Sequence, residues 1–259
     1  MAEKDKIKNN IGRLFYKDYY KEVDFDKVLF GNADKDNDLQ IDNVIKNSPL
    51  VQIEKPVDDI NHIIATIQYP GLITGVGLSH DAKVGYKLGM HFDYTHGMPI
   101  VYGSSVKGVL CEYFKEFYEG NLDVEDLIED IFSGKVRNTE KDKYDDKGKL
   151  LKGYDNKSIY KRDIFFDAVI KSPFRNDKNQ DSFLVDDSIT PHTEGPLKNP
   201  TPIKMLKIAP GCKIEFRFQL KDSNGFSKKD KLEIFKNILG TVGVGAKTNV
   251  GYGQLKIEK

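Results

Sequence analysis

The chain has 259 residues, of which 39% are hydrophobic and 31% are charged, and it contains as many basic as acidic side chains. The hydrophobic content is low and the charged content is high for a globular protein, which indicates a core that carries long solvated insertions. No run of about 18 apolar residues occurs, which argues against a membrane protein. The first ten residues lack the apolar segment of a signal peptide, and the two cysteines, Cys111 and Cys212, have neither metal-ligand spacing nor a disulfide framework. The composition predicts a cytoplasmic protein without membrane contact, metal or cofactor.

The charge is unevenly distributed along the chain. Residues 200–259 contain 12 basic and 5 acidic side chains, which gives a net charge of +7. Residues 1–60 contain 10 basic and 13 acidic side chains, which gives a net charge of −3. A basic region attracts a polyanion such as nucleic acid even when the whole protein is neutral. A lysine-rich face that is simply solvated explains the same composition, so charge alone leaves both interpretations open.

The N-terminal third predicts one helix and one strand. Apolar residues at helical intervals predict a helix over residues 10–23, and we assign residues 1–60 to an N-terminal helical extension. Residues 62–69 predict a strand whose apolar side is formed by Ile63, Ala65, Ile67 and Tyr69. Residues 70–103 contain seven glycines and predict irregular or hairpin structure.

Residues 104–120 predict the first helix of the core, with an apolar stripe of Val106, Val109, Leu110, Tyr113, Phe114 and Phe117. Ser104 or Ser105 can cap its N-terminus. The stretch YGSSVKG at its start combines backbone donors, the positive end of the helix dipole and the Lys107 ammonium, which suits a phosphate group. Ordinary capping, with Lys107 in water, is the alternative.

The C-terminal half predicts strands and a second helix around a charged insertion. Residues 133–161 are charged and aperiodic, which predicts a mobile insertion. Strands are predicted over residues 162–170, 182–190, 211–220 and 252–259, and a helix over residues 227–240. The order of elements is the βαββαβ pattern of a ferredoxin-like α+β fold with long insertions, which we assign to residues 61–259.

Two of these elements have specific local patterns. In the strand over residues 211–220, one face is formed by Ile214, Phe216, Phe218 and Leu220, and the other by Lys213, Glu215, Arg217 and Gln219. In the second helix, Ser227 and Asp230 predict a capping box, and Gly240 can end the helix. Its core-facing residues are predicted to be Leu232, Phe235, Ile238 and Leu239.

The stretch GVGAKTNVGYG, residues 243–253, is a candidate binding loop. Two features argue against a P-loop: Ala246 occupies the lysine position, and a predicted helix, not a strand, precedes the loop. The loop glycines, which include Gly243 and Gly245, can direct successive amides into a nest for anionic oxygens. Lys247 and Thr248 can add a charge and a hydroxyl, and Tyr252 can offer a stacking surface. The alternative is that the glycines only permit close packing.

Enzyme-like arrangements are sparse. His91, Asp93 and His96 match no metal signature and are better explained by a surface hairpin. His192 and the pair His80–Asp81 lie in polar stretches, where a general base is one interpretation and a turn residue the other. The sequence contains no nucleophile elbow and no context for a cysteine nucleophile.

Four motifs in this order resemble the RAMP superfamily of CRISPR-associated proteins: YGSSVKGVL, IFSG, DIFFDAVI and GVGAKTNVGYG. Two further stretches, NIGRLFYKDYY and DDSITPHTEGPLKNPTPIKMLKIAPG, resemble the sixth subunit of the type III-B Cmr effector complex. The resemblance covers most of residues 62–257. The four spaced motifs together are specific, whereas the glycine loop alone indicates only the superfamily.

The resemblance implies an RNA-recognition-like ferredoxin fold and a non-catalytic, RNA-binding structural subunit of an antiviral effector complex. It implies contacts with the 3′ region of the guide crRNA and with the guide–target RNA duplex. It also implies three protein partners, namely the repeated backbone RAMP subunit, the small helical subunit and a neighbouring terminal RAMP subunit. The insertion at residues 133–161 is expected to become partly ordered on assembly.

The same resemblance assigns roles to individual residues. Guide phosphates would be contacted by Ser104, Ser105 and Lys107, with Gly243, Gly245, Lys247 and Thr248 beside them. Tyr102 and Cys111 depart from the family pattern, which has a proline and an arginine there, and the absent arginine removes one expected phosphate contact. The alternative functions are a RAMP endoribonuclease that uses His80 or His192 as base, and a related subunit of a neighbouring type III complex.

Overall fold

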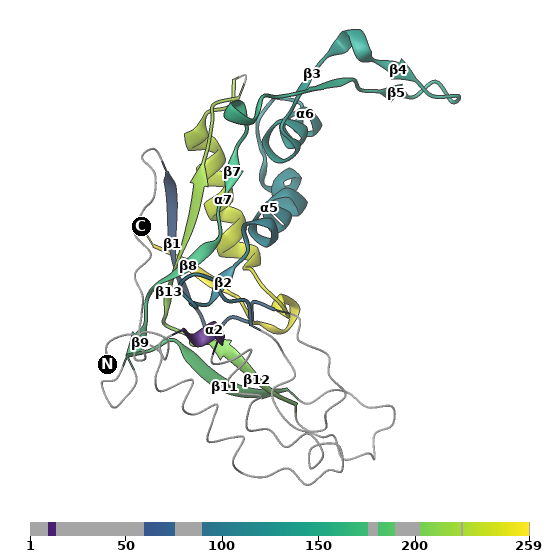
Figure 1. The fold of residues 1–259 in the computed structure, drawn as a ribbon. Coiled ribbons are helices and arrows are strands. Elements are labelled where there is room, and N and C mark those ends of the chain that lie inside the picture. Colours follow the sequence, from purple (N-terminus) through teal and green to yellow (C-terminus); the bar gives the residue numbers. More distant parts are fainter. Residues whose placement is uncertain are drawn as a thin grey trace, which may run out of the picture.

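The computed structural model describes residues 10–13, 60–75, 90–175, 181–189, 203–223 and 225–258 (Figure 1). Their helices are α2 (Ile11–Arg13), α5 (Gly103–Phe117), α6 (Val124–Ile128) and α7 (Lys228–Val242), with a π-helical turn η3 (Glu129–Ser133) and 3₁₀ turns η4 (Thr139–Lys141), η5 (Ile159–Lys161) and η6 (Thr248–Val250). Their strands are β1 (Asn61–Ile67), β2 (Ile100–Val101), β3 (Lys135–Arg137), β4 (Lys143–Tyr144), β5 (Leu150–Leu151), β6 (Tyr154–Asn156), β7 (Ile164–Phe165), β8 (Ala168–Ser172), β9 (Phe174–Arg175), β10 (Asp181–Ser182), β11 (Leu184–Ile189), β12 (Ile203–Ile208), β13 (Lys213–Gln219) and β14 (Leu255–Ile257). Most of the predicted extension over residues 1–60, including its helix beyond α2, lies outside the described residues.

A six-stranded antiparallel sheet forms the centre of the fold. Its strands lie in the order β14-β1-β13-β8-β2, and β7 also pairs with β13. When β1, β8, β13 and β14 are numbered as the four strands of a βαββαβ unit, their order in the sheet is fourth, first, third, second. Helices α5 and α7 contact each other and cover one face of this sheet (Figure 1). The predicted ferredoxin-like α+β fold is confirmed.

The hydrophobic core lies between the sheet and the two helices. The buried residues that were predicted to face it include Ile63, Ala65, Ile67, Val106, Leu110, Phe114, Ile214, Phe216, Phe218, Leu220, Phe235, Ile238 and Leu239. Tyr69 is an exception, because β1 ends at Ile67 and the Tyr69 side chain is 85% exposed. Periodicity therefore identified most of the core, with Tyr69 misplaced just beyond the end of a strand and Leu232 only partly buried.

Polar contacts at the ends of elements differ in part from the predictions. Ser227 and Asp230 form the predicted capping box of α7, but the helix continues past Gly240 and ends at Gly243. Helix α5 begins at Gly103, one residue earlier than predicted, so neither serine is its cap. Instead, Asp167 Oδ1 accepts a hydrogen bond of 2.7 Å from the Gly103 amide.

Two predicted strands are arranged differently from the simple βαββαβ scheme. The strand over residues 162–170 is divided into β7 and β8, and Asp167 lies at the division. Strand β11 lies outside the central sheet and pairs with β12 in a two-stranded ribbon. Both differences come from the choice of pairing partner, β13 for β7 and β12 for β11, which strand periodicity cannot specify.

The two central residues of the polar face of β13, Glu215 and Arg217, are buried, whereas Lys213 and Gln219 are partly buried. Glu215 is fully buried and Arg217 nearly so. Arg217 Nη2 donates to Glu215 Oε2 over 2.8 Å, and Lys171 Nζ lies 3.2 Å from Glu215 Oε1. Desolvation alone would raise the pKa of Glu215, but the hydrogen bonds from Arg217 and Lys171 outweigh it and lower the pKa. Charged residues on this face therefore pair with one another.

A buried ion pair joins three segments of the core. Lys231, on α7, is 0% exposed, and its Nζ lies 2.6 Å from Asp163 Oδ2 and 2.7 Å from the Lys221 carbonyl oxygen. The Lys221 amide donates to Asp163 Oδ1 over 2.6 Å. Desolvation raises the pKa of Asp163, and the charge of Lys231 opposes that shift. The pair connects α7 to the residue before β7 and to the chain just after β13.

We predict that Lys231→Ala destabilises the protein by about 3–5 kcal/mol in urea unfolding, because it leaves the Asp163 carboxylate buried without its cation. Lys236→Ala, on an outer face of the same helix, should cost less than about 1 kcal/mol, since the Lys236–Glu233 pair is solvated. The double variant Lys231→Met with Asp163→Leu should recover most of the loss. Equal losses for Lys231→Ala and Lys236→Ala would contradict this account.

Candidate nucleic-acid interface

The start of α5 presents hydroxyls and a lysine, but few free amides. Ser104 and Ser105 are exposed, and Lys107 is half-buried. The amides of Ser105 and Val106 donate to the Tyr102 carbonyl oxygen, and the Gly103 amide donates to Asp167. The Asp167 carboxylate also places a negative charge beside the helix start. A phosphate at this position would therefore depend on the serine hydroxyls and Lys107 more than on backbone donors.

The glycine loop packs its backbone against the segment that follows β1. The Gly253 amide donates to the Gly71 carbonyl oxygen over 2.8 Å, and the Ala246 amide donates to the Ile73 carbonyl oxygen over 2.8 Å. Gly253 has φ 72°, and a Cβ there would clash with the Val244 carbonyl oxygen. Gly245 has φ 94°, and a Cβ there would clash with the Ile73 carbonyl oxygen. The geometry supports the close-packing interpretation, because these amides bond within the protein rather than lining a nest.

The outer part of the loop is exposed and lies at one end of the helix pair. Lys247 adopts φ 61° and is exposed, and Thr248 begins the turn η6. Helix α7 ends at the glycine loop, and α5 begins at the same end of the molecule (Figure 1). The two candidate motifs therefore lie at the same end of the α5–α7 pair. The expectation that Lys107 and Lys247 act together stays a prediction.

Tyr252 differs from its expected role as a stacking surface. Its side chain is 9% exposed and packs against Ile73 and Met205, and its hydroxyl donates to Asp187 Oδ2 over 2.9 Å. Burial, together with the hydrogen bond to Asp187, raises the pKa of Tyr252 to about 12. In this conformation the ring fixes the loop from inside and offers no open face to a base.

Tyr69 is a candidate stacking residue that the sequence interpretation missed. It precedes Pro70, which lies against Gly251 of the glycine loop. With 85% of its side chain exposed, Tyr69 offers the aromatic surface that Tyr252 lacks. The period-2 pattern continued through residue 69 and placed this tyrosine in the core. The following proline was the available signal that the strand ends earlier.

The histidine-containing hairpin has structural partners. Asp93 Oδ1 accepts hydrogen bonds from the amides of Thr95 and His96, over 3.0 and 2.6 Å, and the Asp93 amide donates to Met98. The ring of His91 stacks on Tyr102, and burial lowers its pKa. The hairpin interpretation of these residues is confirmed. Among the described residues, no three His, Cys, Asp or Glu side chains are grouped as metal ligands. His80, Asp81 and His192 lie outside the described residues.

A family model described as "RAMPs: RAMP superfamily" matches residues 64–256, which include both candidate motifs. The chain belongs to the RAMP superfamily. No curated protein sequence matches it. Within the described ranges of this RAMP protein, no helix is both long and apolar enough to cross a membrane.

Solved structures of Cmr proteins resemble this chain at low sequence identity. A chain in the cryo-EM structure of the type III-B Cmr-beta complex bound to cognate target RNA is 18% identical, with a TM-score of 0.54 over 98% of this chain and 87% of that chain. Cmr6 from Pyrococcus furiosus is 17% identical, with a TM-score of 0.35 over 76% of this chain and 97% of that one. The first match, with a TM-score above 0.5, supports the fold of the described residues.

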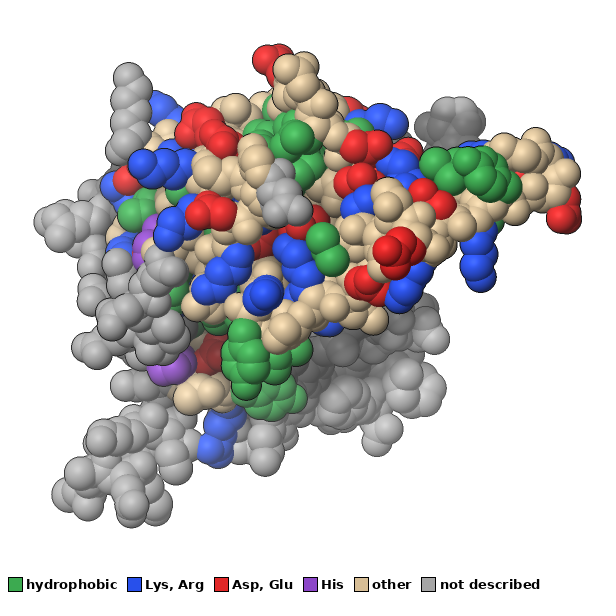
Figure 2. Space-filling model, turned by 90° about the horizontal axis from the view of Figure 1, so that it is seen from above, with side chains coloured by type: hydrophobic (Ala, Val, Ile, Leu, Met, Phe, Trp, Pro, Cys, Tyr) green, Lys and Arg blue, Asp and Glu red, His purple; other side chains and the backbone are tan. Residues whose placement is uncertain are grey.

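The RAMP domain carries a two-stranded arm between η3 and η5. Strands β3 and β6 pair near the body, and β4 pairs with β5 at the tip, which projects away from the sheet (Figure 1). The sequence predicted a charged, aperiodic insertion at residues 133–161, so the regular pairing was missed. Figure 2 shows hydrophobic side chains among charged ones on this arm, and the exposed large hydrophobic residues of its tip are Tyr144, Leu150 and Leu151.

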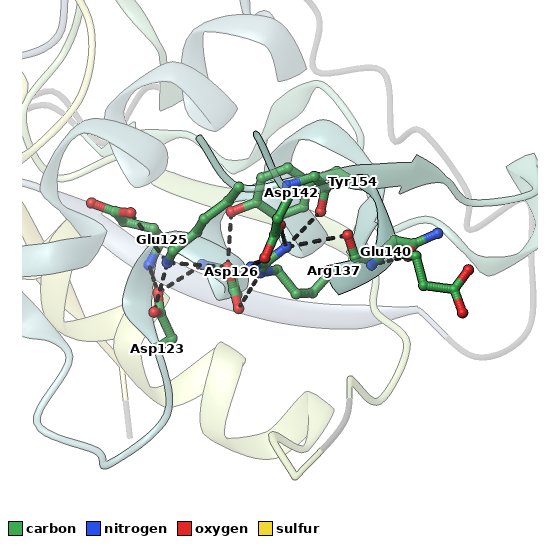
Figure 3. A network of polar contacts seen from close by, with 10 residues as sticks. Asp123, Glu125, Asp126, Arg137, Glu140, Asp142 and Tyr154 are labelled. Atoms are coloured by element: carbon green, nitrogen blue, oxygen red, sulfur yellow. Dashed lines mark hydrogen bonds and ion pairs between the residues drawn. The ribbon is translucent and has the colours of Figure 1, made fainter. Parts of the chain in front are cut away.

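Ion pairs hold the base of the arm to α6, as Figure 3 shows. Arg137 forms a bidentate pair with Asp142 over 2.5 and 2.7 Å, and its Nε lies 3.7 Å from Asp126. Tyr154 donates its hydroxyl proton to Asp126, and Lys152 Nζ lies 2.6 Å from Asp123. The hydrogen bond from Arg137 lowers the pKa of Asp142 to about 2. Pairing of opposite charges, rather than apolar burial, therefore orders this segment.

We predict that Asp142→Asn increases amide hydrogen exchange at the base of the arm, over residues 135–142 and 153–156, because it breaks the bidentate pair. Since the pKa of Asp142 is lowered in the folded state, its contribution is complete above its ordinary value near 4 and is lost as pH falls toward about 2. Asp146→Asn, on the exposed tip, is the matched control. Equal exchange in both variants would contradict the role of the pair.

That the insertion at residues 133–161 is mobile in the isolated protein stays a prediction. Fast amide hydrogen exchange at the tip of the arm would support it.

We predict that Gly253→Ala destabilises the protein by more than the roughly 1–3 kcal/mol cost of a left-handed alanine, since its Cβ also meets backbone. Gly108→Ala is the control, because a Cβ at this helical position meets open space. It should stabilise the protein by about 0.5–1 kcal/mol. Thermal unfolding measures both changes, and a neutral Gly253→Ala would show that the loop relaxes around a side chain.

Proposed function

We propose that this RAMP protein is an RNA-binding structural subunit of a type III-B CRISPR (Cmr) effector complex and that it holds the 3′ region of the guide RNA. The observation that carries the proposal is the position of the two motifs at one end of the α5–α7 pair. There, exposed Ser104, Ser105 and Lys247 accompany Lys107. Hydroxyls and ammonium groups are the usual ligands of a nucleic-acid backbone, which they bind without reading its sequence. The whole-chain match to a subunit of the target-bound Cmr-beta complex supports the same assembly.

The negative charge of a cleft between α5 and α7 also favours RNA binding at the end of the helix pair that carries the two motifs. An open cleft of about 820 Å³ lies between the C-terminal part of α5 and α7. Its acidic lining residues are Glu116, Glu119, Asp230 and Glu233. Carboxylates repel the phosphates of a polyanion, so RNA would avoid this cleft. The partners we propose are the guide crRNA, its duplex with target RNA, and the backbone, small helical and neighbouring RAMP subunits.

We predict that the double variant Lys107→Ala, Lys247→Ala weakens guide-RNA binding by the assembled complex. Because each lysine that neutralises a phosphate releases counterions, the log–log slope of affinity against salt should flatten by up to about two. Lys115→Ala with Lys229→Ala removes the same charge from exposed positions nearer the opposite end of the two helices. An unchanged slope in the first variant, or an equal change in both, would argue against this surface.

We propose further that this subunit does not cleave RNA. The sequence contains no pairing of base and nucleophile, and the nearest candidates are the isolated residues His80, Asp81 and His192. The alternative is a RAMP endoribonuclease. A reconstituted complex in which His80→Ala or His192→Ala abolishes cleavage, while guide binding and assembly persist, would support that alternative.

A further inference from the structure

A cavity of about 390 Å³ lies between α2 and the hairpin that precedes α5. Its walls are formed by Asn10, Gly12, Arg13, Phe92, Asp93, Tyr94 and Tyr102. This volume falls within the range of about 300–1,000 Å³ that is typical of small-molecule sites. It shares only Tyr102 with the candidate motifs, as the first residue of YGSSVKG and the residue immediately before α5. The cavity therefore adjoins the proposed phosphate-binding helix start without being part of it.

A backbone hydrogen bond joins the two walls of the cavity. The Gly12 amide donates to the Gly97 carbonyl oxygen over 3.3 Å, while within the α2 wall the Arg13 amide donates to the Asn10 side chain over 2.8 Å. The approach requires a glycine, because a Cβ on Gly12 would lie 2.9 Å from Phe92 Cβ. These contacts form the cavity within the chain itself, so a ligand would not need to assemble it.

The aromatic groups of the cavity suit a planar ligand. Tyr102 stacks on His91 with ring centroids 4.3 Å apart, which fixes the orientation of its ring, and 37% of its side chain remains exposed. Tyr94 is 99% exposed at the cavity wall. Stacking on tyrosine is a usual way for proteins to hold an unpaired base, and it does not depend on the identity of that base.

The polar groups of the cavity suit a base that carries an amino group. Arg13 and Asp93 both line the cavity, so its charge is mixed, and the Asp93 oxygens can accept from the amino group of cytosine, adenine or guanine. Asp93 Oδ1 already accepts from the amides of Thr95 and His96. No hydrogen bond to Oδ2 occurs among the described residues, which leaves this oxygen for a ligand.

We propose that this cavity, the Tyr102 pocket, holds one unpaired nucleobase of an RNA strand whose phosphate lies at the start of α5. The proposal rests on the proposed function, because it needs RNA at that helix start. The base would stack on Tyr102 and Tyr94, and Asp93 would accept a hydrogen bond from its amino group.

The test uses the full chain and a short single-stranded RNA that carries 2-aminopurine, whose fluorescence is quenched when the base stacks on an aromatic ring. Tyr102→Ala should lower RNA affinity roughly tenfold and remove the protein-dependent quenching, within the range found when stacking aromatics are truncated. Tyr102→Phe should retain both, since stacking requires the ring and not the hydroxyl. Tyr144→Ala removes an exposed tyrosine on the distant arm and should change neither.

The outcomes separate the pocket from the proposed function. If Tyr102→Ala behaves like Tyr144→Ala while the wild-type chain binds RNA, the pocket is rejected and the proposed function is unaffected. Absence of quenching by the wild-type chain also rejects the pocket, whereas the proposed function is decided by the salt dependence of the complex. Should Tyr102→Ala fail to fold, Tyr94→Ala replaces it, because so exposed a side chain contributes little to folding. Unaltered quenching in a folded Tyr94→Ala protein would then overturn the proposal.

Discussion

The contact between two stretches of backbone, the glycine loop and the segment after β1, determines where the functional groups of this protein lie. Four loop glycines and Gly71 have positive φ, and several of them approach carbonyl oxygens too closely for any side chain. The contact fixes the chain between α7 and β14, and it leaves Lys247 and Thr248 at the outer edge of the loop. It also places Tyr69 next to the loop on an exposed turn. The same contact therefore packs the loop backbone and positions the exposed candidate residues.

Charge has three different uses in this fold. In the core, Lys231 and Asp163 join α7 to the ends of two strands, and their burial makes each dependent on the other. On the arm, solvated pairs such as Arg137–Asp142 give order to a segment with few buried apolar groups. At the end that carries the two candidate motifs, lysines remain at the surface. A neutral total charge thus gives no indication of how the charges are used.

Local patterns in the sequence predicted most of the fold, and distant contacts account for what they missed. The alternation in β13 and the capping box at Ser227 depend only on neighbouring residues, so both were predictable. The Asp167 contact that begins α5 joins residues 64 positions apart, and the Lys231–Asp163 pair joins residues 68 apart. In the candidate site, the exposed serines and Lys247 were predicted, whereas the burial of Tyr252 and the exposure of Tyr69 depend on tertiary packing. The arm was missed because its charged residues pair across a turn and leave no hydrophobic period to detect.

The glycine loop contains positions that tolerate no other side chain and positions that tolerate many. Gly243, Gly245 and Gly253 are confined by neighbouring carbonyl oxygens, whereas Lys247, Asn249 and Val250 are exposed and bounded by this rigid frame. Substitutions among these exposed residues would alter the affinity for a ligand at little cost in stability. Single mutations at these positions could therefore change the outer surface of the loop without disturbing the scaffold beneath it.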